Sequence, residues 1–181
     1  MRVITGSARG RRLETLPGED IVRPTTGKVK EAMFSILQFQ LPGRKILDLF
    51  AGCGQLGIEA LSRGAESATF VDSSRNSIEV IKRNLTACGF FSSAKVLQMD
   101  ALQFLNSKNE KYDIVLLDPP YRAGLAQQAL PLLPALMNDG GVILCETALE
   151  EELPAEIGTF AIDREYRYGK IKLTSYRLKS L

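Results

Sequence analysis

Between Lys45 and Cys145 short apolar runs alternate with helical patterns, and this alternation constrains the fold more than any other feature of the chain. The apolar runs predict five strands: Ile46–Phe50, Ala68–Asp72, Lys95–Met99, Tyr112–Leu117 and Val142–Cys145. Strands that are apolar throughout are buried on both faces, which is typical of a parallel sheet covered by helices. We therefore predict a doubly wound α/β fold, whose ligand site lies at the carboxyl ends of the strands.

Both ends of the chain depart from this alternation. The stretch Ile4–Leu13 is short, Gly-rich and basic, and it predicts a small β-hairpin. Apolar residues recur at helical spacing over residues 26–39, which indicates an amphipathic helix. Two alternating runs around Gly169, within Phe160–Leu178, predict an antiparallel hairpin. The chain is thus expected to comprise a basic extension over residues 1–40 and a main domain over residues 41–181.

Charge is unevenly distributed along the chain. Residues 1–30 hold seven Lys and Arg against three Asp and Glu, and residues 164–181 hold six against one. Residues 31–163 hold ten basic against seventeen acidic residues, so the formal net charge is only +2. Two basic ends on an acidic body favour a polyanionic partner over a uniformly solvated surface.

The composition excludes several classes of enzyme. The chain has no histidine, so Ser-His-Asp hydrolases and His-based metal sites are excluded. The three cysteines are far apart and form no C-x-x-C pair, which argues against a zinc or redox motif, and we expect no metal. There is neither a long apolar span nor a signal-peptide pattern, so we expect a cytoplasmic protein with no membrane partner.

A glycine-rich loop follows the first predicted strand of the main domain. Its glycines, Gly52, Gly54 and Gly57, have G-x-G-x-x-G spacing between a strand and a helix. Glycine allows a sharp turn and a close approach of the ligand to the backbone. The loop predicts a nucleoside cofactor, bound by Asp48, Phe50, Ala51, Gly52, Gly54 and Gly57. The loop alone fits NAD as well as S-adenosylmethionine.

Acidic residues also end the next two strands. Asp72, followed by Ser73, can accept hydrogen bonds from both ribose hydroxyls of an adenosine. Asp100, followed by Ala101, can accept from an adenine amino group, although helix capping explains Asp100 equally well. These four residues complete the predicted cofactor site.

The most specific motif is Asp118-Pro119-Pro120-Tyr121, at the end of the fourth strand. An exocyclic aryl amine is a poor nucleophile because its lone pair is delocalised into the ring. Two acceptors on its N–H bonds, the Asp118 carboxylate and the Pro119 carbonyl, would free that lone pair. Pro120 would rigidify the turn, and Tyr121 would offer a flat face on which an extruded base can stack. We predict these four residues to be catalytic.

On these motifs the chain resembles the bacterial 16S ribosomal RNA (guanine-N2)-methyltransferase family. The resemblance is carried by Asp48–Gly54, Gly57–Ala65, Ile4–Leu13 and Arg23–Thr25 together with the Asp-Pro-Pro-Tyr motif. It implies a Rossmann-like class I methyltransferase fold, S-adenosylmethionine as the cofactor, and 16S ribosomal RNA within the small ribosomal subunit as the substrate. Within the glycine loop Cys53 and Gln55 replace the smaller residues that the family pattern would place there.

The basic ends are the predicted RNA grip. The candidate RNA-binding residues are Arg9, Arg11, Arg12, Arg23, Thr25, Lys28, Arg167, Lys170 and Lys172. Such contacts to phosphates would position RNA without specifying its sequence. No obligate protein partner is evident.

Three alternatives stay open on the residues alone. An N6-adenine methyltransferase acting on RNA or DNA shares the Asp-Pro-Pro-Tyr motif, although DNA enzymes usually add a target-recognition domain. A nicotinamide dehydrogenase explains the glycine loop but not Asp118–Tyr121. A non-enzymatic RNA-binding module would not require an intact Asp118.

Overall fold

The fold was analysed in a computed structural model that describes residues 1–18, 26–107, 110–121 and 123–180. It is built on one eight-stranded sheet in the order β3-β2-β1-β4-β5-β8-β7-β6. The strands are β1 (Lys45–Leu49), β2 (Ser67–Asp72), β3 (Ala94–Gln98), β4 (Tyr112–Leu117), β5 (Met137–Ala148), β6 (Glu156–Ile157), β7 (Phe160–Tyr168) and β8 (Ile171–Leu178). The α-helices are α2 (Thr26–Leu37), α3 (Gln55–Ser62), α4 (Arg75–Cys88), α5 (Ala101–Ser107) and α6 (Leu125–Ala129), with 3-10 segments at Phe91–Ser93 and Leu130–Leu136.

The five central strands are parallel and the C-terminal strands are antiparallel. β1 pairs in parallel with β2 and β4, β2 with β3, and β4 with β5. β8 then pairs antiparallel with β5, and β7 pairs antiparallel with β8. The strand order reverses direction at β1, so the carboxyl ends of β1 and β4 face a topological switch point. The predicted Rossmann-like fold with an antiparallel C-terminal hairpin is confirmed.

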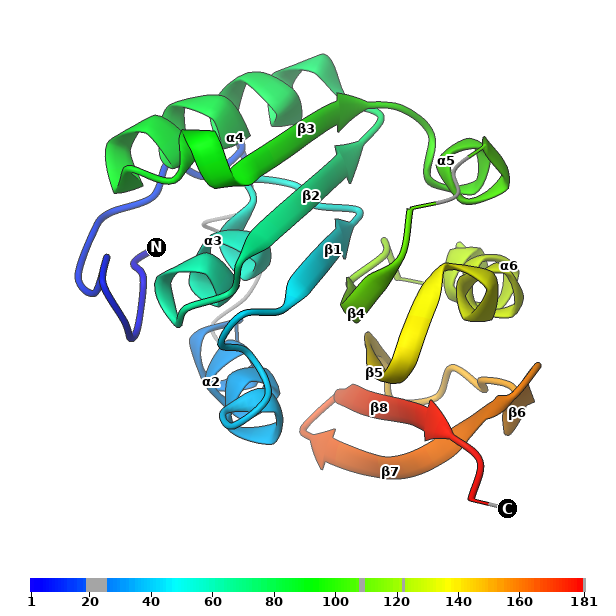
Figure 1. The fold of residues 1–181 in the computed structure, drawn as a ribbon. Coiled ribbons are helices and arrows are strands. Elements are labelled where there is room, and N and C mark those ends of the chain that lie inside the picture. Colours follow the sequence, from blue (N-terminus) through cyan, green and yellow to red (C-terminus); the bar gives the residue numbers. More distant parts are fainter. Residues whose placement is uncertain (19–25, 108–109, 122, 181) are drawn as a thin grey trace.

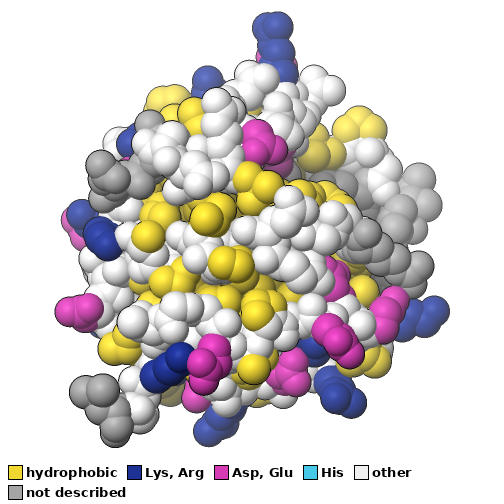
Figure 2. All heavy atoms as spheres, turned by 90° about the vertical axis from the view of Figure 1, so that its right-hand side faces the viewer, with side chains coloured by type: hydrophobic (Ala, Val, Ile, Leu, Met, Phe, Trp, Pro, Cys, Tyr) yellow, Lys and Arg dark blue, Asp and Glu magenta, His cyan; other side chains and the backbone are white. Residues whose placement is uncertain are grey.

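Helices cover both faces of the sheet, and each face has its own core. Figure 1 shows α2, α3 and α4 on one side of the sheet, and α5 and α6 on the other. Successive strand residues point to opposite faces, so Ile46 belongs to the core beneath α2–α4, and its neighbour Leu47 belongs to the core beneath α5 and α6. On the outer surface over α5 and α6, apolar side chains occupy the middle, and Lys and Arg lie toward the rim (Figure 2). That face is therefore not where the basic ends of the chain gather.

The N-terminal segment differs from the predicted hairpin of two strands. Its antiparallel pairing is short: it comprises an isolated bridge between Arg2 and Arg12 and backbone hydrogen bonds from Val3 N to the Arg11 carbonyl and from Leu13 N to the Met1 carbonyl, each at 3.0 Å. The backbone N–H groups of Ile4 and Thr5 donate to the Glu59 carboxylate of α3, at 2.9 Å each, in place of a neighbouring strand. Gly6, at φ 91°, lies so close to α3 that a Cβ there would be 1.8 Å from the Ser62 carbonyl oxygen. The segment is thus shaped by its docking on α3.

Glu59 is the centre of this docking. Its side chain is fully buried and forms ion pairs with Lys30 of α2 at 3.1 Å and with Arg63 at 3.0 Å. Burial by itself would raise the pKa of Glu59, but hydrogen bonds from Ile4 and Thr5 and the charge of Lys30 bring that pKa below its ordinary value. One ionised carboxylate therefore joins the N-terminal segment, α2 and α3.

The division of the chain at residue 40 stays a prediction. Val3, Leu13 and Met33 from the proposed extension belong to the same core cluster as Ile58 of α3. Any such division would therefore cut across one continuous apolar core.

Within the described residues, no helix is long and apolar enough to cross a membrane.

We predict that Glu59→Gln lowers the free energy of unfolding by about 3–5 kcal/mol, because it leaves Lys30 buried without its counter-charge. Glu79→Gln is the matched control: it removes the carboxylate of another i,i+4 pair with an arginine, but both partners are exposed. That change should lower the free energy of unfolding by less than about 0.5 kcal/mol. Urea unfolding measures both, and equal losses would contradict the role given to Glu59.

Candidate active site

A cavity of about 660 Å³ opens at the carboxyl ends of β1, β2 and β4. Most of the predicted catalytic and cofactor-binding residues line it: Asp48, Phe50, Ala51, Gly52, Asp72, Ser73, Asp100, Ala101, Asp118, Pro119 and Pro120. Gly54, Gly57 and Tyr121 are not part of this lining. The structure thus brings together residues that lie up to 72 positions apart, because parallel strands end at one edge of the sheet.

The glycine loop wraps one wall of the cavity. Gly52 and Gly54 have φ values of 56° and 83°, and Phe50 has a φ of 63°, which is an uncommon conformation for a residue other than glycine. The Asp72 carboxylate holds this loop, since Oδ2 accepts from Gly52 N and Oδ1 from Ser74 N, each at 2.9 Å. Strained backbone that is held from several sides is typical of ligand sites.

Asp72 therefore has a structural task that the sequence did not reveal. Each of its carboxylate oxygens can accept a further hydrogen bond beyond the one from the backbone. Ribose recognition by Asp72 is compatible with this geometry and stays a prediction.

Asp100 caps α5, because its Oδ1 accepts from Gln103 N at 3.0 Å. The capping interpretation of Asp100 is correct, and its proposed contact with adenine is untested.

Asp48 lies at the floor of the cavity and is fully buried. Burial raises its pKa to about 8; a hydrogen bond from Gly57 N, at 2.9 Å, opposes this rise, and the charge of Asp72 adds to it. Gly57 itself serves packing, because a Cβ there would lie 2.3 Å from the Phe70 ring of β2. The third glycine of the motif thus brings α3 close to the sheet, which allows Gly57 N to reach Asp48.

The N-terminal segment supplies a wall that sequence reasoning missed. Leu16, Pro17 and Gly18 line the cavity together with residues at the carboxyl ends of the strands. Asn84 of α4 holds the segment there: its Oδ1 accepts from Glu14 N at 2.8 Å, and its Nδ2 donates to the Glu14 carbonyl at 3.0 Å. The same Nδ2 donates to the Cys53 carbonyl of the glycine loop at 2.9 Å. One buried amide thus ties both walls together, and an Asn within a helical pattern gave no sign of this role.

Gln55 is another lining residue outside the predicted set. Its Oε1 is buried and has no hydrogen-bond partner among the described residues. Gln55, which replaces the smaller residue of the family pattern, therefore lies within the candidate site. No group of three His, Cys, Asp or Glu side chains that could hold a metal ion occurs in the described parts of the chain.

The Asp-Pro-Pro-Tyr turn follows β4 directly. Asp118, Pro119 and Pro120 face the cavity, whereas the half-buried Tyr121 packs against the core beneath α2–α4. The Tyr121 hydroxyl donates to Oε1 of Glu146 at 2.5 Å. Stacking of a base on Tyr121 stays a prediction. The hydrogen bond to Glu146 was not expected, although the rule that selected Asp72 and Asp118 also applies to this carboxylate at the end of an apolar strand.

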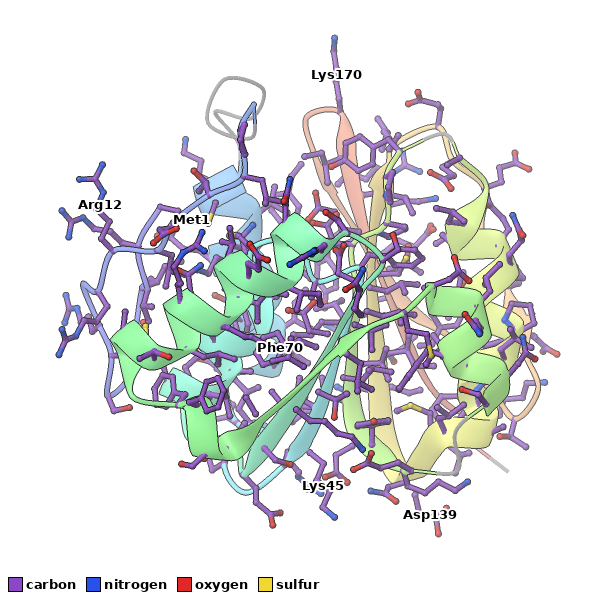
Figure 3. The ribbon with its side chains drawn as sticks, turned by 90° about the horizontal axis from the view of Figure 1, so that it is seen from above. Met1, Arg12, Lys45, Phe70, Asp139 and Lys170 are labelled. Atoms are coloured by element: carbon purple, nitrogen blue, oxygen red, sulfur yellow. The ribbon has the colours of Figure 1, made fainter. Side chains whose placement is uncertain are left out.

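The predicted RNA-binding residues have different surroundings. Arg9, Arg11, Arg12, Lys28, Arg167 and Lys170 are exposed, and Arg23 and Thr25 lie outside the described residues. Figure 3 shows Arg12 and Lys170 projecting away from the body of the protein at different places on its rim. Lys170 is at the tip between β7 and β8, next to Ile171, which pairs with Ala148 at the carboxyl end of β5. This tip therefore lies at the same edge of the sheet as the cavity.

The assignment of Lys172 to the RNA grip is wrong. Its side chain is buried, and Nζ donates to the Glu151 carbonyl at 2.8 Å and forms an ion pair with Glu165 at 3.2 Å. Residues 171–176 of β8, which lies between β5 and β7, are all buried, whereas the tip residue Lys170 precedes the strand and faces solvent. The number of basic residues in the C-terminal segment thus overestimates the number of basic side chains that are exposed to a partner.

Comparison with known proteins assigns the chain to a family. The profile of the family described as "Conserved hypothetical protein 95" matches residues 1–177. The chain belongs to this family. It is 37% identical to "Putative rRNA methyltransferase YlbH" of Bacillus subtilis (strain 168), over 98% of each chain. It is 35% identical to "Ribosomal RNA small subunit methyltransferase D" of Escherichia coli (strain K12), over 98% of this chain and 88% of the relative.

A solved structure agrees with this placement. The "Putative methyltransferase yhhF from Escherichia coli" superimposes with a TM-score of 0.86 at 34% identity, over 100% of this chain and 99% of that chain. The predicted resemblance to ribosomal RNA methyltransferases is thereby confirmed over nearly the whole chain.

The buried Asp48 makes stability depend on pH. The pKa of Asp48 is about 8 in the folded protein, whereas 3.8 is its ordinary value, so the folded state retains a proton that the unfolded chain loses as pH rises between these values. Relative to Asp48→Asn, the wild type should therefore lose stability from pH 4 to pH 8, by at most about 1.4 kcal/mol per pH unit. Urea unfolding across this range tests it. Asp139→Asn, at an exposed position, is the control and should follow the wild type.

Proposed function

We propose that this protein transfers a methyl group from S-adenosylmethionine to the exocyclic N2 amino group of a guanine in 16S ribosomal RNA. The observation that carries the proposal is that Asp118, Pro119 and Pro120 line the same cavity as the glycine loop. A site for an amine and a site for a nucleoside cofactor thus share one space. The names of two relatives support the coarser part of the proposal, which is methylation of ribosomal RNA.

The residues around the cavity fit the cofactor. The volume of about 660 Å³ lies within the usual range for small-molecule sites. Asp72 has carboxylate lone pairs for ribose hydroxyls, and Met99, Ala101 and Leu102 form an apolar wall suited to adenine. The Phe50–Leu56 wall, including Gln55, is then left for the amino-acid portion. When bound, S-adenosylmethionine supplies a methyl group already activated by its sulfonium.

The chain's own contribution to the chemistry is to prepare the amine. Two acceptors at the end of β4, the Asp118 carboxylate and the Pro119 carbonyl, would bind the two N–H bonds of the target amine and restore its nitrogen lone pair. Because prolines fix the turn, these acceptors are oriented before the base enters. The amine, aligned with the methyl group, would bond to it, and the proton that the amine loses would pass to the Asp118 carboxylate; this requires neither histidine nor a metal.

The proposed substrate is RNA in an assembled particle in the cytoplasm. The exposed Arg9, Arg11 and Arg12 lie on the N-terminal segment, and Lys170 lies at the β7–β8 tip, so phosphates could be held on either side of the cavity. Such contacts carry little sequence information. Selection of one guanine therefore depends on shape, which favours a small ribosomal subunit over protein-free RNA.

The deciding experiment identifies the methylated nucleoside. Small subunits and protein-free 16S ribosomal RNA are each incubated with methyl-labelled cofactor, and the RNA is digested. We expect N2-methylguanosine, formed faster on subunits. N6-methyladenosine would refute the proposed base, and equal rates on naked RNA would refute the proposal that the substrate is an assembled particle.

Asp118→Ala should lower kcat at least about 100-fold while the affinity for the cofactor is unchanged. Asp139→Ala, far from the cavity, should leave activity unchanged.

Removal of charge at the N-terminal turn should weaken RNA binding across sequences. For Arg11→Gln with Arg12→Gln, the slope of log affinity against log salt should fall by about one for each lost phosphate contact. The matched control is Arg44→Gln with Lys45→Gln, two exposed basic residues at the amino end of β1. Its slope should not change. Affinity for the cofactor should be unaffected in both, as measured by calorimetry.

A further inference from the structure

Two carboxylates lie side by side on neighbouring strands: Asp118 directly follows β4 and lines the cavity, and Glu146 lies two residues before the end of β5. Asp118 follows Leu117 of β4, and Leu117 pairs with Cys145 of β5, so Glu146 is the residue alongside Asp118 in the register. Leu117 and Cys145 both belong to the core beneath α5 and α6. By strand alternation Asp118 and Glu146 are both directed to the opposite face. Adjacent strands lie about 4.8 Å apart, so these carboxylates are within reach of one base.

Glu146 is held in place by the turn that carries Asp118. Its side chain is only 5% exposed, and its Oε1 accepts from the Tyr121 hydroxyl at 2.5 Å. A hydroxyl bond to an ionised carboxylate is short and strong, and it fixes the orientation of both groups. A carboxylate has about four lone-pair positions, so Glu146 can bind more than one donor at once. The catalytic turn and the neighbouring carboxylate therefore form one unit.

The Watson–Crick edges of the two purines differ next to the amine. In guanine the N2 amino group lies beside N1–H, which is a second donor. In adenine the N6 amino group lies beside an N1 lone pair, which is an acceptor. A site with two neighbouring carboxylates thus matches guanine, whereas it would set acceptor against acceptor with adenine. Sites built to hydrogen-bond a group discriminate strongly against an analogue that lacks it.

We propose that Glu146 is a specificity-determining residue that accepts a hydrogen bond from N1–H of the target guanine while Asp118 binds its N2 amino group. The Tyr121 hydroxyl holds the Glu146 carboxylate in position for this contact. The inference rests on the proposed guanine-N2 activity and adds the group that selects guanine over adenine. It assigns a substrate contact to a residue that no motif in the sequence marked.

The test uses 2-aminopurine, which keeps the N2 amine but has a lone pair in place of N1–H. Once the methylated guanine has been mapped, 16S ribosomal RNA carrying either base at that position is prepared by ligation and assembled into small subunits. We expect the wild type to prefer guanine about 10- to 100-fold in kcat/KM, as for loss of one hydrogen bond to a charged group. In Glu146→Gln the amide can donate to N1 of 2-aminopurine, so the preference should fall to about threefold or reverse.

Three controls separate reading of the base from structural support. Calorimetry should give the same cofactor affinity for Glu146→Gln as for the wild type, which shows that the fold and the cofactor site are intact. Tyr121→Phe removes the hydroxyl but keeps Glu146, so it should lower kcat/KM on guanine and retain most of the preference. Should Glu146→Gln not fold, Glu146→Asp, which withdraws the carboxylate by one methylene, should narrow the preference instead.

The outcomes distinguish this inference from the function on which it rests. A full guanine preference in Glu146→Gln, or a loss of preference in Tyr121→Phe as large as in Glu146→Gln, would overturn the direct contact alone. Absence of N2-methylguanosine with the wild type would overturn the proposed function and this inference together.

Discussion

A single buried carboxylate, Glu59, determines how the N-terminal segment meets the rest of the protein. It accepts two backbone N–H groups from Ile4 and Thr5 and forms ion pairs with Lys30 and Arg63. Because Glu59 lies on the helix that follows the glycine loop, the same helix carries both the cofactor loop and the basic turn. An ionised group at this depth is tolerable only when it is fully partnered, so the interaction requires all of these elements to be in place.

The cavity is stabilised by polar side chains that bind the backbone around it. Asp72 holds Gly52, Asp48 holds Gly57, and Asn84 joins the glycine loop to the N-terminal segment. These contacts fix the backbone of the loop before a cofactor binds. Preorganisation of this kind lowers the entropy lost on binding, and it keeps the methyl donor aligned with the amine that Asp118 is proposed to hold. Binding geometry and fold stability therefore depend on the same residues.

Much of the fold was predictable because period-2 and period-3.6 apolar patterns are local properties of the chain. The five central strands and the C-terminal hairpin follow the predicted runs. The N-terminal turn pairs with itself only around Arg2 and Arg12, because the Glu59 side chain of α3, distant in sequence, accepts from the backbone N–H groups of Ile4 and Thr5. Lys172 was misassigned because charge counting does not show that β8 lies between two other strands and is buried over residues 171–176. The hydrogen bond from Tyr121 to Glu146 was not predicted because the two residues are 25 positions apart in the sequence.

The sequence by itself determined the order of strands and helices, the glycine loop, the acidic residues at the strand ends and the Asp-Pro-Pro-Tyr turn. These features are encoded by residue type and spacing, so one sequence suffices to identify them. Only the tertiary structure decided which carboxylates line the cavity, which ones cap or anchor the backbone, and which basic side chains reach solvent. It also placed Glu146 beside Asp118 and Leu16–Gly18 in the lining of the cavity. Such pairings arise from strand register and from packing between segments far apart in the chain, and neither is expressed in any local pattern.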